Sequence, residues 1–148
     1  MSALAAASGG FLLAVLWFDL MFDVQVLRHP SGDLPEAVLA SIAGYYRRVT
    51  TDARRMSYAV RVAMLVAVVG ALRQFASGAV IGIASLVACA VPIALAVRRV
   101  VPNAVRLGTR RDPPAVQTEL ARGICRDHFV CLACIAAFVG LQVVAAPH

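Results

Sequence analysis

Long apolar runs alternate with arginine-rich segments along this chain, and this alternation predicts its fold. The runs cover residues 4–24, 56–75, 77–97 and 128–146. Each is close to the roughly 20 residues that a helix needs to cross a bilayer. Almost nothing separates the second run from the third, so these two should form a tight antiparallel hairpin of helices. The pattern therefore predicts an all-α, four-transmembrane-helix bundle that forms a single integral membrane domain over residues 1–148.

Composition supports contact with the lipid bilayer. The chain is 61% hydrophobic and only 15% charged, whereas a globular domain is about half apolar and about one quarter charged. A soluble domain of this size could not bury so much apolar surface, so the excess should face lipid. The net charge of +6 comes from fourteen arginines and no lysine, placed mainly between the apolar runs. This distribution is typical of membrane loops and argues against nucleic-acid binding.

The arginine distribution also predicts the orientation. The connection 27–55 holds five arginines and the connection 98–127 holds seven, whereas only Arg73 lies at the turn between the second and third spans. Arginine-rich loops stay on the cytoplasmic side of a membrane. Both connections should be cytoplasmic and both termini outside, as expected of a bacterial inner membrane protein. The first residues lack the basic start of a signal peptide, so we expect them to remain in the mature protein.

The first connection contains a predicted amphipathic cytoplasmic helix. Asp33 and Glu36 have capping-box spacing, with Pro35 in the first turn. The apolar residues that follow recur at helical spacing: Val38, Ile42, Tyr45, Tyr46 and Val49. We expect this helix to lie on the inner leaflet, with its terminal arginines toward anionic head groups.

The second connection predicts a helix that starts well before the last span. Asp112 is a good N-cap, and a proline follows at the first helical position. Gly123 interrupts the pattern before the last span, but a helix tolerates it. The fourth span should therefore be the outer half of one long helix that projects into the cytosol.

Charged residues recur near the cytoplasmic ends of the predicted spans. Asp23 lies at the boundary of the first span, and Asp19 lies about 6 Å deeper at 1.5 Å per residue. Arg61 reaches a similar depth, about 7 Å, on the second span. Because an unpaired charge in the bilayer is costly, we expect Arg61 to be the counter-charge of both aspartates. An ion pair that only fixes the helix register is the structural alternative.

Other polar residues are predicted to join the same layer. They are Asn103, Arg106, Arg126, Asp127, His128, Cys131 and Cys134. For Asp23, Arg126 and Asp127 the competing interpretation is a solvated position at the interface, and for His128 it is an interfacial anchor. The i, i+3, i+6 spacing of His128, Cys131 and Cys134 drifts around a helix, so no metal site is predicted.

Small residues and a proline predict features of helix packing. Gly78 and Gly82 form a small-xxx-small face on the third span, which lets a neighbouring backbone approach closely. Pro92 should kink that span. The four cysteines, of which Cys89 is the first, lie in or just before apolar runs and should behave as small buried side chains rather than as disulfides.

The segment Cys131-Leu132-Ala133-Cys134, at the head of the last helix, resembles the vitamin K epoxide reductase family. In that family such a pair reduces a quinone, because one thiol attacks and the other resolves. Two features argue against this resemblance. The family needs a second cysteine pair in the first loop, but no cysteine precedes Cys89, and the predicted orientation places the pair on the reducing cytoplasmic side.

The C-terminal half carries a different resemblance. Pro92 lies within the third span, PNAVRL follows at 102–107, and ELARGICRDHFVCLACIAAFVGL leads into the last span at 119–141. These features resemble the anthrone-oxygenase-like family of small four-helix integral membrane proteins. An aromatic residue ahead of the last span is missing here, and Cys131 stands where that family's pattern has arginine. The resemblance implies cofactor-poor oxygenation of a polyketide.

Three functions are compatible with these patterns. The first is binding or oxidation of a lipophilic small molecule, polyketide or quinone-like, at the polar layer. The second is a non-catalytic scaffold or accessory subunit, with the Gly78/Gly82 face contacting a second copy or another membrane protein. The third is export, since small multidrug exporters use one carboxylate in their first helix, as Asp19 could be used. Whether the chain is an enzyme and which cofactor, if any, it uses stay open.

The orientation can be tested in intact cells. A tag fused after His148 should react with a membrane-impermeant reagent, because the arginine-rich connections hold both termini on the opposite side. A tag in the connection 27–55 serves as the control and should react only after the cells are permeabilised. A C-terminal tag that reacts only in permeabilised cells would reverse the predicted orientation.

Overall fold

The computed structural model describes residues 2–76 and 80–145, and all the regular structure in these residues is helical. The main helices are α1 (Ser2–Asp23), α2 (Glu36–Arg47), α3 (Arg54–Ala76), α4 (Val80–Leu95), α5 (Val101–Thr109) and α6 (Pro114–Val144). Three short helical turns join them: η1 (Val24–Arg28), η2 (Arg48–Asp52) and η3 (Ala96–Val100). The predicted edges of two spans, residues 77 and 146, lie outside the described residues.

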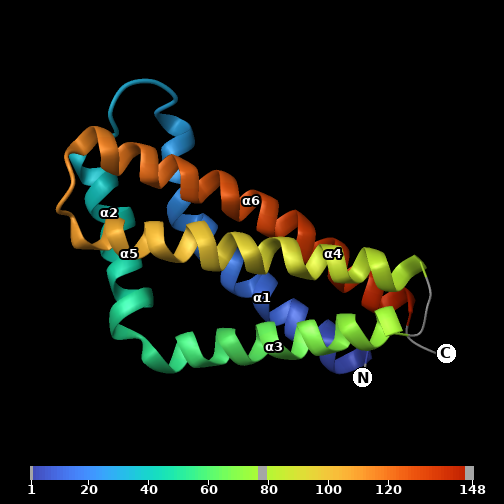
Figure 1. Cartoon of the computed structure of the whole chain (residues 1–148). Coiled ribbons are helices and arrows are strands. Elements are labelled where there is room, and N and C mark those ends of the chain that lie inside the picture. Colours follow the sequence, from blue (N-terminus) through green and yellow to red (C-terminus); the bar gives the residue numbers. More distant parts are fainter. Residues whose placement is uncertain (1, 77–79, 146–148) are drawn as a thin grey trace.

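Four helical segments of the described chain are long and apolar enough to cross a membrane, which confirms the predicted fold class. They are Ala3–Arg28, Arg55–Ala76, Val80–Thr109 and Pro114–Val144. In the bundle, α1 packs against α3 and α6, and α4 packs against the same two helices (Figure 1). We call the end that carries α2, α5 and the start of α6 the α2 end. The start of α1 and the end of α6 share the opposite end (Figure 1).

The third span is longer than predicted. The apolar run was expected to end at residue 97, but the helix continues through η3, a π-helical turn, into α5 and ends at Thr109 (Figure 1). Pro92 lies inside α4, and Pro102 lies in the first turn of α5. A local π turn can provide new hydrogen bonds for the backbone groups that a proline leaves unpaired, so a membrane helix can continue past the proline. The two prolines therefore modify this helix but do not terminate it.

The long last helix is confirmed, although its cap differs from the prediction. Pro113, not Asp112, is the N-cap of α6, and Pro114 occupies the first helical position. Asp112 instead accepts two hydrogen bonds from Arg106, both of 2.8 Å. Arg110 has a positive φ of 55° at the end of α5 and turns the chain back toward α6. The carboxylate thus stabilises the turn rather than the helix end.

The α2 end has an apolar core of its own. Leu39, Ile42, Ala43 and Tyr46 of α2 are buried against α5 and α6. Their partners include Val100, Ala104, Leu107, Ala121, Ile124 and Cys125. The amphipathic face of α2 was predicted from its spacing, but the expectation that it lies on the leaflet is wrong. Two other helices of the same chain, α5 and α6, cover it.

The start of α2 also differs from the predicted capping box. Pro35 is the N-cap and Asp33 does not cap the helix. The backbone N–H of Leu34 donates to the Thr118 hydroxyl at 2.9 Å, and Leu34 is buried. Glu36 forms an ion pair with Arg110 across the gap to α5. Contacts to α5 and α6, rather than local capping, therefore position this end of α2.

Close approach between α3 and α4 depends on Gly82. A Cβ atom at this position would clash with the carbonyl oxygen of Gln74 and would lie 2.7 Å from the Cα of Phe75. Both contacts are with backbone, which cannot rotate away. The neighbour of Gly82 is therefore α3 of the same chain; Gly78, the other glycine of the predicted pair, lies outside the described residues.

The contact at Gly82 can be tested by substitution. Gly82→Ala should destabilise the protein by about 1–3 kcal/mol, because the added methyl group forces the two helices apart. Gly140→Ala is the control: nothing lies within 4 Å of its added Cβ, and alanine is favoured over glycine in a helix by up to about 1 kcal/mol. Thermal unfolding in detergent measures both variants. Equal stability of the two variants would contradict the close approach.

Candidate functional site

A fully buried carboxylate joins three helices at the α2 end of the bundle. Asp23, the last residue of α1, has no exposed surface. One of its oxygens accepts a 2.6 Å hydrogen bond from the hydroxyl of Tyr46 on α2. The other is bonded at 2.6 Å to Nδ1 of His128 on α6. An unpaired carboxylate would be very costly in this position, and these two partners compensate for its burial.

Asp19 extends the same cluster one helical turn further into the bundle. Its Oδ1 accepts a 2.6 Å hydrogen bond from the hydroxyl of Tyr45. Its Oδ2 lies 3.8 Å from Nε2 of His128. The imidazole ring of His128 therefore lies between two carboxylates, with Asp23 at one nitrogen and Asp19 near the other.

Local sequence spacing explains how α1 and α2 present these groups. Asp19 and Asp23 are four residues apart, so both lie on the face of α1 that meets α2. The Phe22 ring stacks on the Tyr45 ring with centroids 4.1 Å apart. Gln25 also donates a hydrogen bond to the Ser41 hydroxyl at 3.1 Å. These contacts hold the consecutive tyrosines of α2 beside the two aspartates.

The hydrogen-bond partners define the protonation pattern of the cluster. Burial, together with the neighbouring carboxylates, raises the pKa of the Tyr45 and Tyr46 hydroxyls above the ordinary tyrosine value. Both tyrosines therefore stay protonated and act as donors. Because Nδ1 of His128 contacts the carboxylate of Asp23, it carries a proton. In the neutral imidazole, Nε2 is then a free acceptor on the side of Asp19.

An apolar cavity of about 140 Å³ adjoins the cluster inside the bundle. Its walls come from α1, α3, the α4–α5 helix and α6. The lining residues are Leu12, Val15, Leu16, Asp19, Val60, Met64, Pro92, Ile93, Ala96, Val100, Val101, His128, Cys131 and Ile135. Only Asp19, His128 and Cys131 bring polar side chains to this wall. The cavity can therefore accept an apolar group and offers polar contacts on one side.

The cysteines contribute little polar chemistry to this region. All four are free thiols; Cys89, Cys125 and Cys131 are buried, and Cys134 is partly buried. The Cys131 thiol donates to the Pro92 carbonyl oxygen at 3.7 Å. No group of three or more His, Cys, Asp or Glu residues in the described chain could hold a metal ion.

Arg61 does not pair with Asp19, contrary to the sequence-based expectation. Its side chain is exposed, and its guanidinium lies 5.5 Å from the centre of the Tyr58 ring. The core face of α3 carries Ala63 and Ala67, and a residue two positions before Ala63 points to the opposite side of a helix. Arg61 therefore lies on the wrong face of α3 to reach the aspartates, and His128 is the side chain that contacts both of them.

The remaining predicted residues occupy separate positions. Asp127 is buried, with Nε of Arg99 3.1 Å from one oxygen and Nε of Arg126 3.8 Å from the other. Arg106 bonds Asp112 in the turn after α5, away from the cluster. Asn103 is partly buried on α5. Of the predicted polar layer, the structure brings together Asp19, Asp23 and His128, with Cys131 at the adjoining cavity.

Sequence reasoning missed the role of the two tyrosines. Tyr45 and Tyr46 were identified only as part of the apolar face of α2, yet their hydroxyls are the donors to Asp19 and Asp23. The sequence did contain an indication of this role. Two consecutive tyrosines on a helix that packs beside Asp19 and Asp23 bring two hydroxyl donors to these carboxylates. Recognising it requires knowing that α2 packs against α1.

Comparison with known proteins identifies no relative. No family model, curated protein or solved structure matches the chain. The geometry of the site is therefore what indicates which molecules the chain can bind.

The cluster can be tested by removing one hydroxyl. Tyr46→Phe should destabilise the protein by about 1–3 kcal/mol, because the buried Asp23 loses one of its two donors. Tyr58→Phe is the control, because Tyr58 is exposed and should change stability by less than about 0.5 kcal/mol. Thermal unfolding of both variants in the same detergent measures the difference. Equal melting temperatures would show that Tyr46 does not stabilise the carboxylate.

Proposed function

We propose that this chain binds a lipophilic small molecule with a phenol- or quinone-type ring in the cavity beside His128. The observation that supports this proposal is the position of the Asp19–His128–Asp23 cluster at the wall of an apolar cavity. Ligand sites typically combine apolar walls with a few polar groups that fix the orientation. Here the apolar walls bind the ring, and His128 and Asp19 bind its polar substituent.

The size of the cavity narrows the ligand class. Its volume of about 140 Å³ is close to that of an apolar protein cavity of about 150 Å³ that binds benzene. One aromatic ring fits such a space, whereas the fused rings of a polyketide would extend beyond it. The volume thus favours a ligand with a single ring, and any apolar tail would continue out of the cavity.

The polar wall can accept a hydroxyl proton. Asp23 holds the Nδ1–H of His128, so Nε2 is oriented as an acceptor beside Asp19. A phenolic or quinol hydroxyl in the cavity would donate to Nε2. The carboxylates on both sides of the imidazole would stabilise a positive charge on it.

The hydrogen bond between Asp23 and His128 favours a second candidate function, base catalysis. A carboxylate that orients a histidine is a common arrangement for a general base. In this step the hydroxyl proton passes to Nε2, and the O–H electron pair stays on oxygen, which leaves an aromatic oxyanion and an imidazolium. The anthrone-oxygenase-like resemblance agrees with such a step, since an oxyanion is more easily oxidised than the neutral ring.

The arginine distribution supports a location for the site. Twelve of the fourteen arginines lie in the two connections of the α2 end, and arginine-rich loops stay on the cytoplasmic side. This supports placing the α2 end at the cytoplasmic face of a membrane such as the bacterial inner membrane. The ligand would then enter from the cytoplasmic half of the bilayer.

The two other candidate functions, export and a non-catalytic scaffold, receive less support from the structure. An exporter of drug-sized molecules needs a pocket of about 300 Å³ or more, which exceeds this cavity. For the scaffold interpretation, Gly82 was expected to contact another chain, but α3 covers it. Extraction of small molecules from gently purified protein distinguishes these functions, since a scaffold carries no ligand in the cavity.

Binding can be measured with two probes that differ in one hydroxyl. We expect 4-ethylphenol to bind about tenfold more tightly than ethylbenzene, because its hydroxyl donates to a buried charged cluster. Titration calorimetry in detergent gives the affinities, and the rise in melting temperature gives an independent measure. Equal affinities of the two probes would show that the polar wall is not used.

The cavity itself can be tested by filling it. Val60→Phe places a larger side chain in the cavity and should abolish binding of both probes. Val62→Phe is the matched control, because Val62 is an exposed residue of the same helix and does not line the cavity. Equal binding by the two variants would contradict the proposed location.

A further inference from the structure

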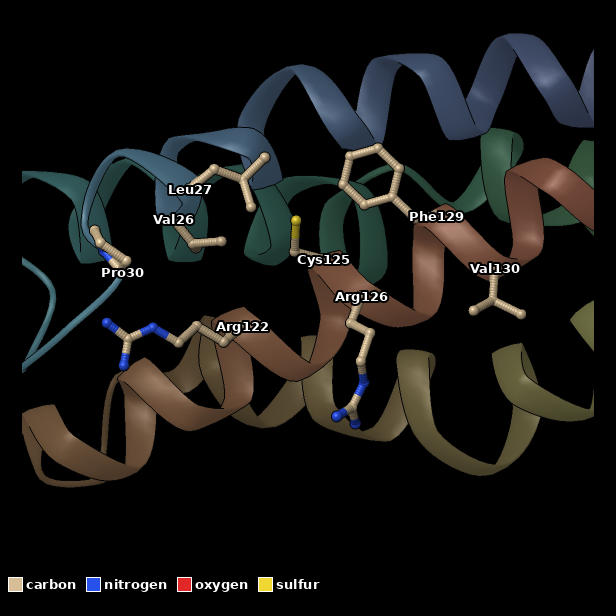
Figure 2. Close-up of a pocket in the computed structure, with 8 residues that line it drawn as sticks. All are labelled: Val26, Leu27, Pro30, Arg122, Cys125, Arg126, Phe129 and Val130. Atoms are coloured by element: carbon tan, nitrogen blue, oxygen red, sulfur yellow. The ribbon is translucent and has the colours of Figure 1, made fainter.

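A second hollow lies on the outer surface of the bundle, separate from the cavity at His128. Its volume is about 510 Å³, and it lies between η1 with the chain that follows and the side of α6. Its lining residues are Val26, Leu27, Pro30, Arg122, Cys125, Arg126, Phe129 and Val130 (Figure 2). We call it the α6 groove. None of these residues lines the cavity beside His128.

The α6 groove is amphipathic along its length. Figure 2 shows Arg122, Arg126 and Phe129 in order along α6, with Val26, Leu27 and Pro30 opposite. Apart from the two arginines, the lining side chains are hydrocarbon or thiol. Leu27 and Phe129 are exposed although they are large and apolar. One stretch of the groove therefore offers positive charge, and the next offers apolar surface.

The α6 groove lies where the sequence of α6 changes from charged to apolar. Arg126 and Asp127 are the last charged residues of α6, and the helix is apolar or uncharged beyond His128. Phe129 and Val130 are thus at the start of the apolar segment, and Arg122 and Arg126 lie on its charged side, as expected at the boundary of a membrane. Aromatic and arginine side chains are typical of this boundary.

Both arginines keep hydrogen-bonding capacity for an anion. One terminal nitrogen of Arg122 donates to the carbonyl oxygens of His29 and Gly32, at 2.7 and 2.8 Å. Its other nitrogens make no hydrogen bond to the described residues. The side chain is therefore held in place and still has donors for an anion. Arg126 is 70% exposed, and its nearest acidic partner, Asp127, is closer to Arg99.

We infer that the α6 groove binds an anionic phospholipid of the surrounding bilayer. The phosphate and its head group contact Arg122 and Arg126, and one acyl chain lies along Leu27, Phe129 and Val130. Guanidinium groups bind phosphate through charge-assisted hydrogen bonds, and basic pockets between membrane helices are suited to anionic head groups. A free phosphate would use only the arginines, so the apolar part of the groove selects the lipid.

The experiment compares two lipids with identical acyl chains. Phosphatidylglycerol and phosphatidylcholine are titrated into the detergent-solubilised full chain, and native mass spectrometry measures the affinity of each. The wild type should prefer phosphatidylglycerol. Arg126→Gln should reduce this preference about tenfold, because only phosphatidylcholine adds a cationic choline to the phosphate, and the lost arginine no longer repels it. Arg126 is a surface residue, and an unchanged melting temperature in phosphatidylcholine confirms that the variant is folded.

Arg111→Gln is the matched control, since it removes the same charge from an exposed residue outside the α6 groove. It should leave the lipid preference unchanged. Equal losses for the two variants would show general attraction to a basic surface and would overturn the inference.

A second pair of variants tests the apolar part of the α6 groove. Phe129→Ala should weaken the binding of both lipids. Phe18→Ala changes an exposed phenylalanine of α1 outside the groove and should weaken the binding of neither. Equal effects of the phenylalanine variants, or displacement of the lipid by millimolar inorganic phosphate, would also overturn the inference.

Discussion

Burial of the Asp23 carboxylate is the constraint on which the α2 end of this protein depends. A charged group without solvent access needs hydrogen-bond donors, and α1 does not supply them from its own side chains. The donors come from Tyr46 on α2 and His128 on α6. Satisfying one carboxylate therefore fixes three helices relative to one another. This requirement also explains why α2 packs against the protein although its apolar face could have contacted lipid.

The polar cluster lies between two apolar regions of different character. In the terminal half of the bundle, small residues such as Ala5, Ala67 and Ala71 allow the helices to approach closely. At the α2 end, larger residues such as Leu39, Ile42 and Leu107 fill a second core. The cavity beside His128 is lined by Leu12 and Ile135 of the bundle and by Val100 of the larger core. Polar chemistry and empty volume thus meet at the same level of the fold.

Helix α6 takes part in both proposed binding sites through different faces. His128, Cys131 and Ile135 face the interior cavity, whereas Arg126 and Phe129 line the surface groove. A single continuous helix from Pro114 to Val144 makes this possible, since it passes from the arginine-rich end into the apolar bundle without a break. Both proposed binding sites therefore lie at the level where the sequence of α6 changes from charged to apolar, one on its inner face and one on its outer face.

The sequence by itself determined the features that depend on local composition. Four spans, the long last helix and the apolar face of α2 follow from hydrophobic runs and helical spacing, because these patterns reflect burial within one segment. The spacing of Asp19 and Asp23 by one helical turn also follows, since the rise per residue is constant. The two aspartates and His128 could thus be identified as candidate site residues before their contacts were known.

Only the tertiary structure decided which groups meet. Depth along a helix does not define its rotation, so Arg61 could not be excluded as the partner of Asp19, and His128 could not be chosen. The hydroxyls of Tyr45 and Tyr46 were not recognised, because their role depends on the packing of α2 against α1. The third helix also continued beyond its apolar run, since its extension packs on α2. Contacts between distant segments, which no local pattern encodes, create the site.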